Sequence, residues 1–582
     1  QALVDDADRE GWLIIPSAPP IDESRVSTAP AEALLDAFRR KFGGSNVLFW
    51  DLGGGLTDDK ERTVSWTASE VRKADRRRPL GGDLWDGFQA YSQRLDVVGA
   101  HRWPLFTSLE LTSYREWLAQ RRELAGNRPV FWTWVQNHLP EGSPVAAENA
   151  GPHPEQVRQL AFLAVAAGCR GLGFWSDAAL GDAEQGRDRL HGMALLNTEL
   201  DLLDRALTAA GIAGRRTGWL PTSHPYVQAA LIPGQKGLLV LPIWVGPGDQ
   251  YVPGTGAVTG LSLTIPGVAD GQEPWLITPA GVECLRHRMK KTTTGTQLTI
   301  DEFDTVAPIV FTDDLTPRGL VVEWQDHARR YGRSSARWAL DLARATYEKV
   351  KAVHVELAQM GVTVTGGDGL LEQTHRYYAD AETHYANEVY DGAYKNATRA
   401  LRPLRVLMRA HWQLAVGTLD LPSASGWLTF AWVLLLGLIV TGRALGFLHE
   451  DTLLALRSGL VIPGVPVAAT LLSEISLREG ITQRTLLYPL FGPVSRHALA
   501  IGRTVLTALL LMVGAIATSL TLQGLAGIKP DGLGRELLGI GLGSLTYVAL
   551  FGLLHLVSNR GLVTGLALYF TLDEPLGRLQ FS

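Results

Sequence analysis

The segment FWDLGGGL at residues 49–56 is one of five in which a short apolar run leads into Trp, Asp, His or Gln. The other four are LGGDLWD (80–86), VVGAHRWP (97–104), VFWTWVQNH (130–138) and LGFWSDAAL (172–180). Strands are expected at 12–16, 47–52, 79–83, 96–100, 129–136 and 171–176, with helical patterns at 30–42, 113–125 and 154–167 between them. This alternation is typical of a parallel sheet with helices outside it. Six such units predict a partial (β/α)8 barrel over residues 1–215, without its first units.

The strand ends supply the candidate site residues, because barrels carry their active sites at the carboxyl ends of the strands. Indole faces stack on sugar rings, and carboxylates perform acid–base chemistry on glycosidic bonds. The substrate-binding candidates are Trp50, His101, Trp132, Trp134, Gln136, Trp175 and Asp177. The catalytic candidates are Asp51, Asp83 and Glu110. The alternative for the tryptophans is that they cap the barrel core.

Residues 216–315 alternate between short apolar runs and turns such as PGQKG and TTTG. Strands are expected at 227–231, 237–243, 260–265, 274–278, 297–300 and 307–312, and this pattern predicts an antiparallel β-sandwich. A barrel with these strand ends, followed by a small sandwich, resembles the glycoside hydrolases.

The resemblance implies one carboxylate after the fourth barrel strand and another after the seventh. If residues 47–52 are the fourth strand, Asp51 lies near the first of these positions. The seventh strand then ends at Gln136, whose amide cannot act as a nucleophile or an ionised base. Two alternatives follow for the barrel: an active glycoside hydrolase, or a degenerate domain that binds a carbohydrate ligand. Neither requires a cofactor or a metal.

Residues 316–420 are predicted to be helical. The stretch RSSARWALDLARATYEKVKAVHVELAQMG (333–361) has apolar residues at spacings of three and four, and helical patterns follow at 368–389 and 394–416. These patterns predict a three-helix antiparallel bundle. Its basic cluster, Arg399, Arg402, Arg405 and Arg409, is interpreted as a solvated face, with lipid headgroups as the alternative contact.

The last part of the chain has a different composition. The net charge of −5 and the mean hydropathy of +0.05 describe the whole chain, but residues 421–582 contain only 10 of its 54 basic and 8 of its 59 acidic side chains. Uncharged runs at 426–442, 504–528 and 537–558 are long enough to span a bilayer. A kinked run at 458–473 and a short one at 561–572 complete a predicted transmembrane helical domain of four spans and part of a fifth.

The segment SEISLREGITQRTLLYPLFGPVSRHALAIGR (473–503) resembles the loop between the second and third spans of ABC exporter permeases of the ABC-2 type. The matching coupling-loop residues are Glu474, Arg478, Arg484, Tyr488, Pro493 and Arg496. The resemblance implies a dimer of membrane domains in the bilayer and a separate ATP-binding subunit, since the chain has no GxxxxGK[ST] motif. The mildly acidic charge does not favour a nucleic-acid partner.

The two resemblances disagree about topology. Arginines in the 473–503 loop place it in the cytoplasm, and an integral protein of a bacterial inner membrane would then keep residues 1–425 inside. Hydrolase-like barrels with a sandwich belong outside by family habit. The alternatives are a barrel that works inside, an inverted membrane part, and a join of two partial proteins in one chain.

Overall fold

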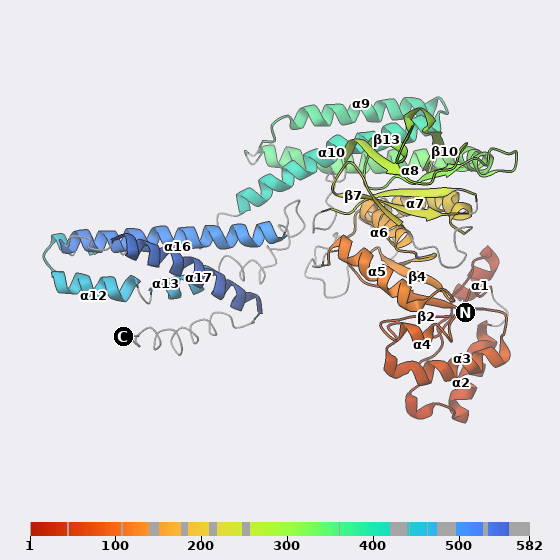
Figure 1. Cartoon of the computed structure of the whole chain (residues 1–582), viewed down its shortest axis with the longest axis horizontal. Helices are drawn as coiled ribbons and strands as arrows, with labels where there is room; N and C mark the ends of the chain where they lie inside the picture. Colours follow the sequence, from red (N-terminus) through yellow and green to blue (C-terminus); the bar gives the residue numbers. More distant parts are fainter. Residues whose placement is uncertain are drawn as a thin grey trace. The chain divides into compact units, whose positions relative to one another are not determined.

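The chain divides into two compact units, residues 1–409 and residues 410–582 (Figure 1). The computed structural model describes residues 2–42, 46–105, 107, 109–138, 151–175, 184–208, 218–234, 236–246, 257–359, 361, 363–419, 439–440, 443–461, 464–473, 496–527 and 533–557. The first unit contains all the described sheets, and the described elements of the second are helices. The predicted boundaries at 215, 315 and 420 stay predictions.

A parallel half-barrel sheet forms the start of the first unit. Its strands β1 (Trp50–Asp51), β2 (Leu80–Asp83), β3 (Val97–Ala100), β4 (Val130–Gln136) and β5 (Gly171–Trp175) are neighbours in chain order. Residues 12–17 extend the sheet beyond β1 through parallel bridges from Ile14 to Val47 and from Ser17 to Asp51. The predicted partial barrel is confirmed at this level, because strand–helix alternation produces parallel neighbours.

Helices connect and cover these strands. They are α1 (Ala2–Glu10), α2 (Ala29–Phe42), α3 (Glu61–Ala74), α4 (Phe88–Tyr91), α5 (Leu111–Ala125), α6 (Pro154–Ala166) and α7 (Glu184–Thr208). In α3, Val64, Ala68 and Val71 form the buried stripe that packs on the sheet. Helix α6 is buried on nearly all sides, because it contacts both β4 and the antiparallel strands that follow.

Two antiparallel sheets form the second layer of the first unit. Their strands are β6 (Gly218–Pro221), β7 (Val227–Pro233), β8 (Leu238–Trp244), β9 (Val258–Ile265), β10 (Glu273–Thr278), β11 (Gly281–Cys284), β12 (Met289–Thr292), β13 (Gly295–Phe303) and β14 (Ile309–Thr312). Six strands form the order β11-β10-β14-β8-β7-β6 and three form β12-β13-β9. Every predicted strand is present. The strands that were not predicted are β6, β11 and β12. Each is only four residues long, which is too short to show a clear apolar alternation, and β12 is mostly exposed.

Helices α8 (Leu320–Gln359), α9 (Gly367–Ala386) and α10 (Tyr390–Leu419) run side by side (Figure 1). Buried alanines, among them Ala339, Ala343, Ala381 and Ala397, line their contacts, and small side chains let the helices approach closely. Helix α8 also packs on α7, so the three helices are joined to the barrel rather than forming a separate bundle.

Three arginines of the basic cluster of α10 pair with acidic side chains of the first unit. Arg399 Nε lies 3.0 Å from Glu302 Oε2, and Arg402 donates two hydrogen bonds of 3.2 Å to Asp304. Arg405 is buried and pairs with Asp304 and Glu155. The interpretation as a solvated face was wrong for Arg402 and Arg405, because helical spacing alone does not reveal the acidic side chains that they meet. The Arg399 side chain remains exposed.

The second unit contains α12 (Glu450–Val461), α13 (Gly464–Ser473), α16 (Arg496–Ala526) and α17 (Leu533–Val557). Among the described residues, one helix is long and apolar enough to cross a membrane, at Thr504–Ala526. The apolar part of α17, Leu537–Phe551, is shorter. The 458–473 run falls on two helices, while 561–572 and most of 426–442 lie outside the described residues. Among the described residues, one of the predicted spans is therefore a candidate by length and composition, and by itself it does not establish a membrane domain.

Candidate functional site

Glycines in the parallel sheet leave room on one face for aromatic rings. A Cβ on Gly81 would lie 2.6 Å from the Phe49 ring, and a Cβ on Gly173 would lie 2.5 Å from the Trp134 ring. A Cβ on Gly99 would meet the Trp132 indole at 2.5 Å. These glycines leave the space that the rings fill, so the sequence of the strands determines where the aromatic residues lie.

The rings form a continuous cluster at the carboxyl end of the sheet. Ring centroids of Trp132 and Trp134 are 4.8 Å apart, and those of Trp134 and Trp175 are 5.4 Å apart. Trp103 continues the cluster, 6.4 Å from Trp175 and 4.9 Å from His101. Trp175 is 44% exposed, so the cluster presents an aromatic surface to solvent.

Asp83 and His101 form a pair beside this cluster. Asp83 is opposite Gly99 in the register of β2 and β3, and His101 lies two residues beyond Gly99, where a strand brings side chains to the same face. His101 Nδ1 lies 2.5 Å from Asp83 Oδ2. This contact orients the imidazole and directs Nε2 away from the carboxylate. Asp83 is 5% exposed, whereas the His101 side chain is 25% exposed, so the histidine is the accessible member.

Two buried polar atoms at this position have no hydrogen-bond partner among the described residues. They are Asp83 Oδ1 and Trp132 Nε1. Both lie close to the point where a Cβ on Gly99 would stand, at 3.1 Å and 2.5 Å respectively. An acceptor on β2 and a donor on β4 therefore lie over the strand between them, β3, without a partner among the described residues. A buried polar group without a partner is costly, so such a pair indicates a function beyond packing.

Asp51 and Gln136 lie at the same end of the sheet but are engaged by the protein. Asp51 accepts hydrogen bonds from Ser17 Oγ at 2.6 Å and from the Gly53 amide at 3.1 Å. The fully buried Gln136 accepts from the Leu105 amide at 2.8 Å and donates to two backbone carbonyls. Both side chains hold the backbone of the site in place.

The other candidates lie apart from the Asp83–His101 pair or outside the described residues. Trp50 is buried on the helical side of the sheet, where it packs on Phe38 and donates to Asp75. Glu110 is the residue before α5. Asp177 lies outside the described residues, as do Glu474, Arg478, Arg484, Tyr488 and Pro493, while only the backbone of Arg496 is described.

Trp103 and His138 belong to the cluster but were absent from the sequence candidates. Their rings are 5.7 Å apart, and His138 Nδ1 lies 3.0 Å from the carbonyl oxygen of Trp175. Both residues stand in the strand-end segments VVGAHRWP and VFWTWVQNH, just beyond the last strand residue. Including the three residues that follow each strand end would have found them.

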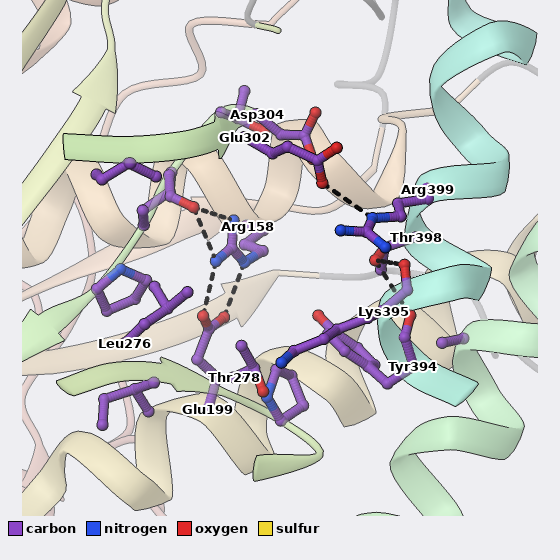
Figure 2. Close-up of a pocket in the computed structure, with 18 of the residues that line it drawn as sticks. Arg158, Glu199, Leu276, Thr278, Glu302, Asp304, Tyr394, Lys395, Thr398 and Arg399 are labelled. Atoms are coloured by element: carbon purple, nitrogen blue, oxygen red, sulfur yellow. Dashed lines mark hydrogen bonds and ion pairs between the residues drawn. The ribbon is translucent and has the colours of Figure 1, made fainter. Parts of the chain in front are cut away.

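A cavity of about 490 Å³ lies elsewhere in the first unit, lined by α6, α7, α10 and antiparallel strands (Figure 2). Arg158 donates to both carboxylate oxygens of Glu199, at 2.8 and 2.6 Å, and Lys395 pairs with Glu283 at 2.8 Å. Burial alone would lower the pKa of Arg158, but Glu199 outweighs burial and raises that pKa above its usual value. Burial, together with Glu199, raises the pKa of the Tyr394 phenol. The charged groups of this cavity pair with one another, so we interpret their role as holding the surrounding helices and strands together.

Within the described residues, no group of three or more His, Cys, Asp or Glu side chains could hold a metal ion. No known family model matches the chain, and no curated protein matches its sequence. Among solved structures, the chain is similar to a glycoside hydrolase of family 5 from Bacteroides vulgatus ATCC 8482, at 13% identity and a TM-score of 0.39. The match covers 56% of this chain and 77% of that chain. A likeness at this level does not establish a family, so function is argued from the site itself.

Proposed function

We propose that the carboxyl end of the half-barrel binds a carbohydrate. The carrying observation is that Asp83 Oδ1 and Trp132 Nε1, which have no hydrogen-bond partner among the described residues, lie beside a solvent-exposed aromatic cluster. Sugars present an apolar ring face and hydroxyl groups that both donate and accept hydrogen bonds. Trp175 supports contact with the ring face, while Asp83 and Trp132 supply an acceptor and a donor for a hydroxyl group.

Binding is proposed ahead of hydrolysis. Glycosidases generally use two carboxyl groups that flank the scissile bond. Asp83 is a carboxylate with an unpartnered oxygen next to the aromatic cluster, whereas both oxygens of Asp51 accept hydrogen bonds from Ser17 and Gly53. Of the predicted catalytic candidates, Asp83 is the one that contacts an accessible histidine, His101, which its carboxylate orients.

The test is a panel of immobilised oligosaccharides probed with the full chain, followed by calorimetry on the best ligand. We expect Trp175→Ala to weaken binding at least tenfold, because the stacking of a sugar on the indole ring is lost. Trp12→Ala is the matched control, since Trp12 is 60% exposed and lies at the opposite end of its strand segment. Absence of any glycan binding by the wild type, or equal loss in both variants, would contradict the proposal.

A second proposal concerns the last part of the chain. We propose that it attaches the protein to a bilayer, because Thr504–Ala526 is long and apolar enough to span one. Exposed apolar side chains on α16 and α17, such as Leu510, Val513 and Leu538, support contact with lipid. The test is alkaline extraction of membranes, in which an integral protein stays with the lipid fraction and a peripheral one is released.

A more specific version of this second proposal is that the last part of the chain is the permease of an ABC exporter. It rests on the resemblance of residues 473–503 alone. It requires a dimer of membrane domains and a separate ATP-binding subunit. Purification of the tagged full chain from its native membrane tests it: an ATPase that co-purifies stoichiometrically supports the permease, and its absence supports a simple membrane attachment.

A further inference from the structure

A second open cavity, of about 640 Å³, lies on the helical side of the parallel sheet. Its lining comes from the end of α2, from β1 and from the connection between α3 and β2. The lining residues are Asp36, Arg39, Arg40, Trp50, Ala74, Asp75, Arg77 and Arg78. Four guanidinium groups and two carboxylates therefore face one cavity, although the chain as a whole has a net charge of −5.

Part of this lining is held in place by hydrogen bonds. Asp75 accepts from the Arg77 and Arg78 amides, from Trp50 Nε1 at 3.1 Å and from Arg78 Nη1 at 3.0 Å. Burial would raise the pKa of Asp75, but these donors outweigh it and lower that pKa. Asp75 therefore stays ionised and organises the loop that presents Arg77 and Arg78.

The remaining arginines retain unused donors. Arg39 pairs with Asp36 and donates to the Glu70 carbonyl at 2.8 Å, yet its buried Nε has no partner among the described residues. The exposed side chains of Arg40 and Arg77 likewise meet no described partner. Guanidinium groups bind oxyanions through paired N–H groups, so the cavity combines unused donors with a surplus of positive charge.

We propose that this cavity binds a terminal phosphate group. The two carboxylates leave a net charge of +2 on the lining, which matches the charge of about −2 that a phosphate monoester carries near neutral pH. The ligand is either a free phosphate or a lipid headgroup that ends in a phosphate monoester. Trp50 also lines the cavity and donates to Asp75.

The test measures binding to the full chain in two arms. Calorimetry with inorganic phosphate reports the free ligand, and flotation with phosphatidic acid vesicles, compared with phosphatidylcholine vesicles, reports the lipid headgroup. We expect the double variant Arg40→Gln/Arg77→Gln to weaken binding at least tenfold in the arm that binds, because it removes two charged hydrogen-bond donors from the cavity. Both arginines are exposed, so the variant keeps the core intact, and circular dichroism verifies this.

Arg62→Gln is the control, because Arg62 is an exposed arginine of α3 outside the cavity. Affinity should also fall from pH 7.5 to pH 5, because the phosphate monoester loses charge around its second pKa of about 6. Wild type that binds in neither arm, or a double variant that binds as tightly as the Arg62→Gln control, would overturn the proposal. Neither result depends on carbohydrate binding, so the two proposals fail separately.

Discussion

Gly99→Ala tests the placement of the aromatic cluster through packing alone. The new methyl group would lie 2.5 Å from Trp132 Nε1 and 2.7 Å from Trp132 Cε2, well inside van der Waals contact. The φ angle of Gly99 is not positive, so alanine causes no backbone strain there. Overpacking of this kind typically costs about 1–3 kcal/mol, and the substitution should destabilise the first unit by that amount.

Gly54→Ala is the matched control for this prediction. A Cβ on Gly54 meets nothing within 4 Å, and its φ angle is not positive either. We expect it to be neutral or to stabilise by up to about 1 kcal/mol, because alanine restricts the unfolded chain. Urea unfolding followed by tryptophan fluorescence measures both variants, since most of the 17 tryptophans lie in the first unit.

A double variant identifies the atoms responsible. Trp132→Ala removes the indole that the methyl group would strike, so Gly99→Ala should cost less in that background. The double variant should be more stable than the sum of the two single effects predicts, by about 0.5–3 kcal/mol, which is the range for residues in contact. If Gly99→Ala proves as stable as Gly54→Ala in the wild-type background, Trp132 does not lie over Gly99 and the geometry of the site is refuted.

Three further predictions concern stability and membrane association. Burial, Arg405 and Lys349 lower the pKa of His153 to about 3, so acid protonates this histidine in the unfolded chain before it does so in the folded protein. Between pH 7 and pH 5, the free energy of unfolding of the wild type should therefore fall by about 2 kcal/mol relative to that of His153→Asn. Urea unfolding at both pH values measures this difference. Glu199→Gln should destabilise the first unit by about 3 kcal/mol because it leaves a buried arginine unpaired, whereas exposed Glu116→Gln should change stability little in thermal melts. Val513→Asp should release the protein from membranes on alkaline extraction, because aspartate costs about 3 kcal/mol in a spanning helix, and no such release would refute the lipid contact.

Much of the first unit could be predicted because local patterns decide it. Apolar runs bounded by glycine gave the strands of the half-barrel and of the antiparallel sheets, and apolar spacing gave α2, α5 and α6. Pairing between distant residues could not be predicted in the same way. Asp83 meets His101 only through the register of β2 and β3, and Trp50 faces the helices because neighbouring strand residues alternate sides.

The cluster on α10 shows the same limit for charge. Arg402 and Arg405 are spaced as on a solvated helical face, yet Asp304, about a hundred residues away in sequence, partners both. In the second unit, the 458–473 run is apolar enough to suggest a span, but the chain there forms two helices of 12 and 10 residues. Hydropathy is averaged over a window of residues, so it does not reveal where one helix ends and the next begins.

The most direct test of the carbohydrate site is a calorimetric titration of the wild type and Asp83→Asn with the best oligosaccharide from the panel. The asparagine side chain keeps the shape of the aspartate but removes the charge of the unpartnered oxygen. Since a hydrogen bond to a charged group contributes about 1.5–3 kcal/mol, the variant should bind at least about tenfold more weakly while unfolding at a similar urea concentration. Equal affinities for the two proteins would show that Asp83 Oδ1 does not receive the ligand and would contradict the account.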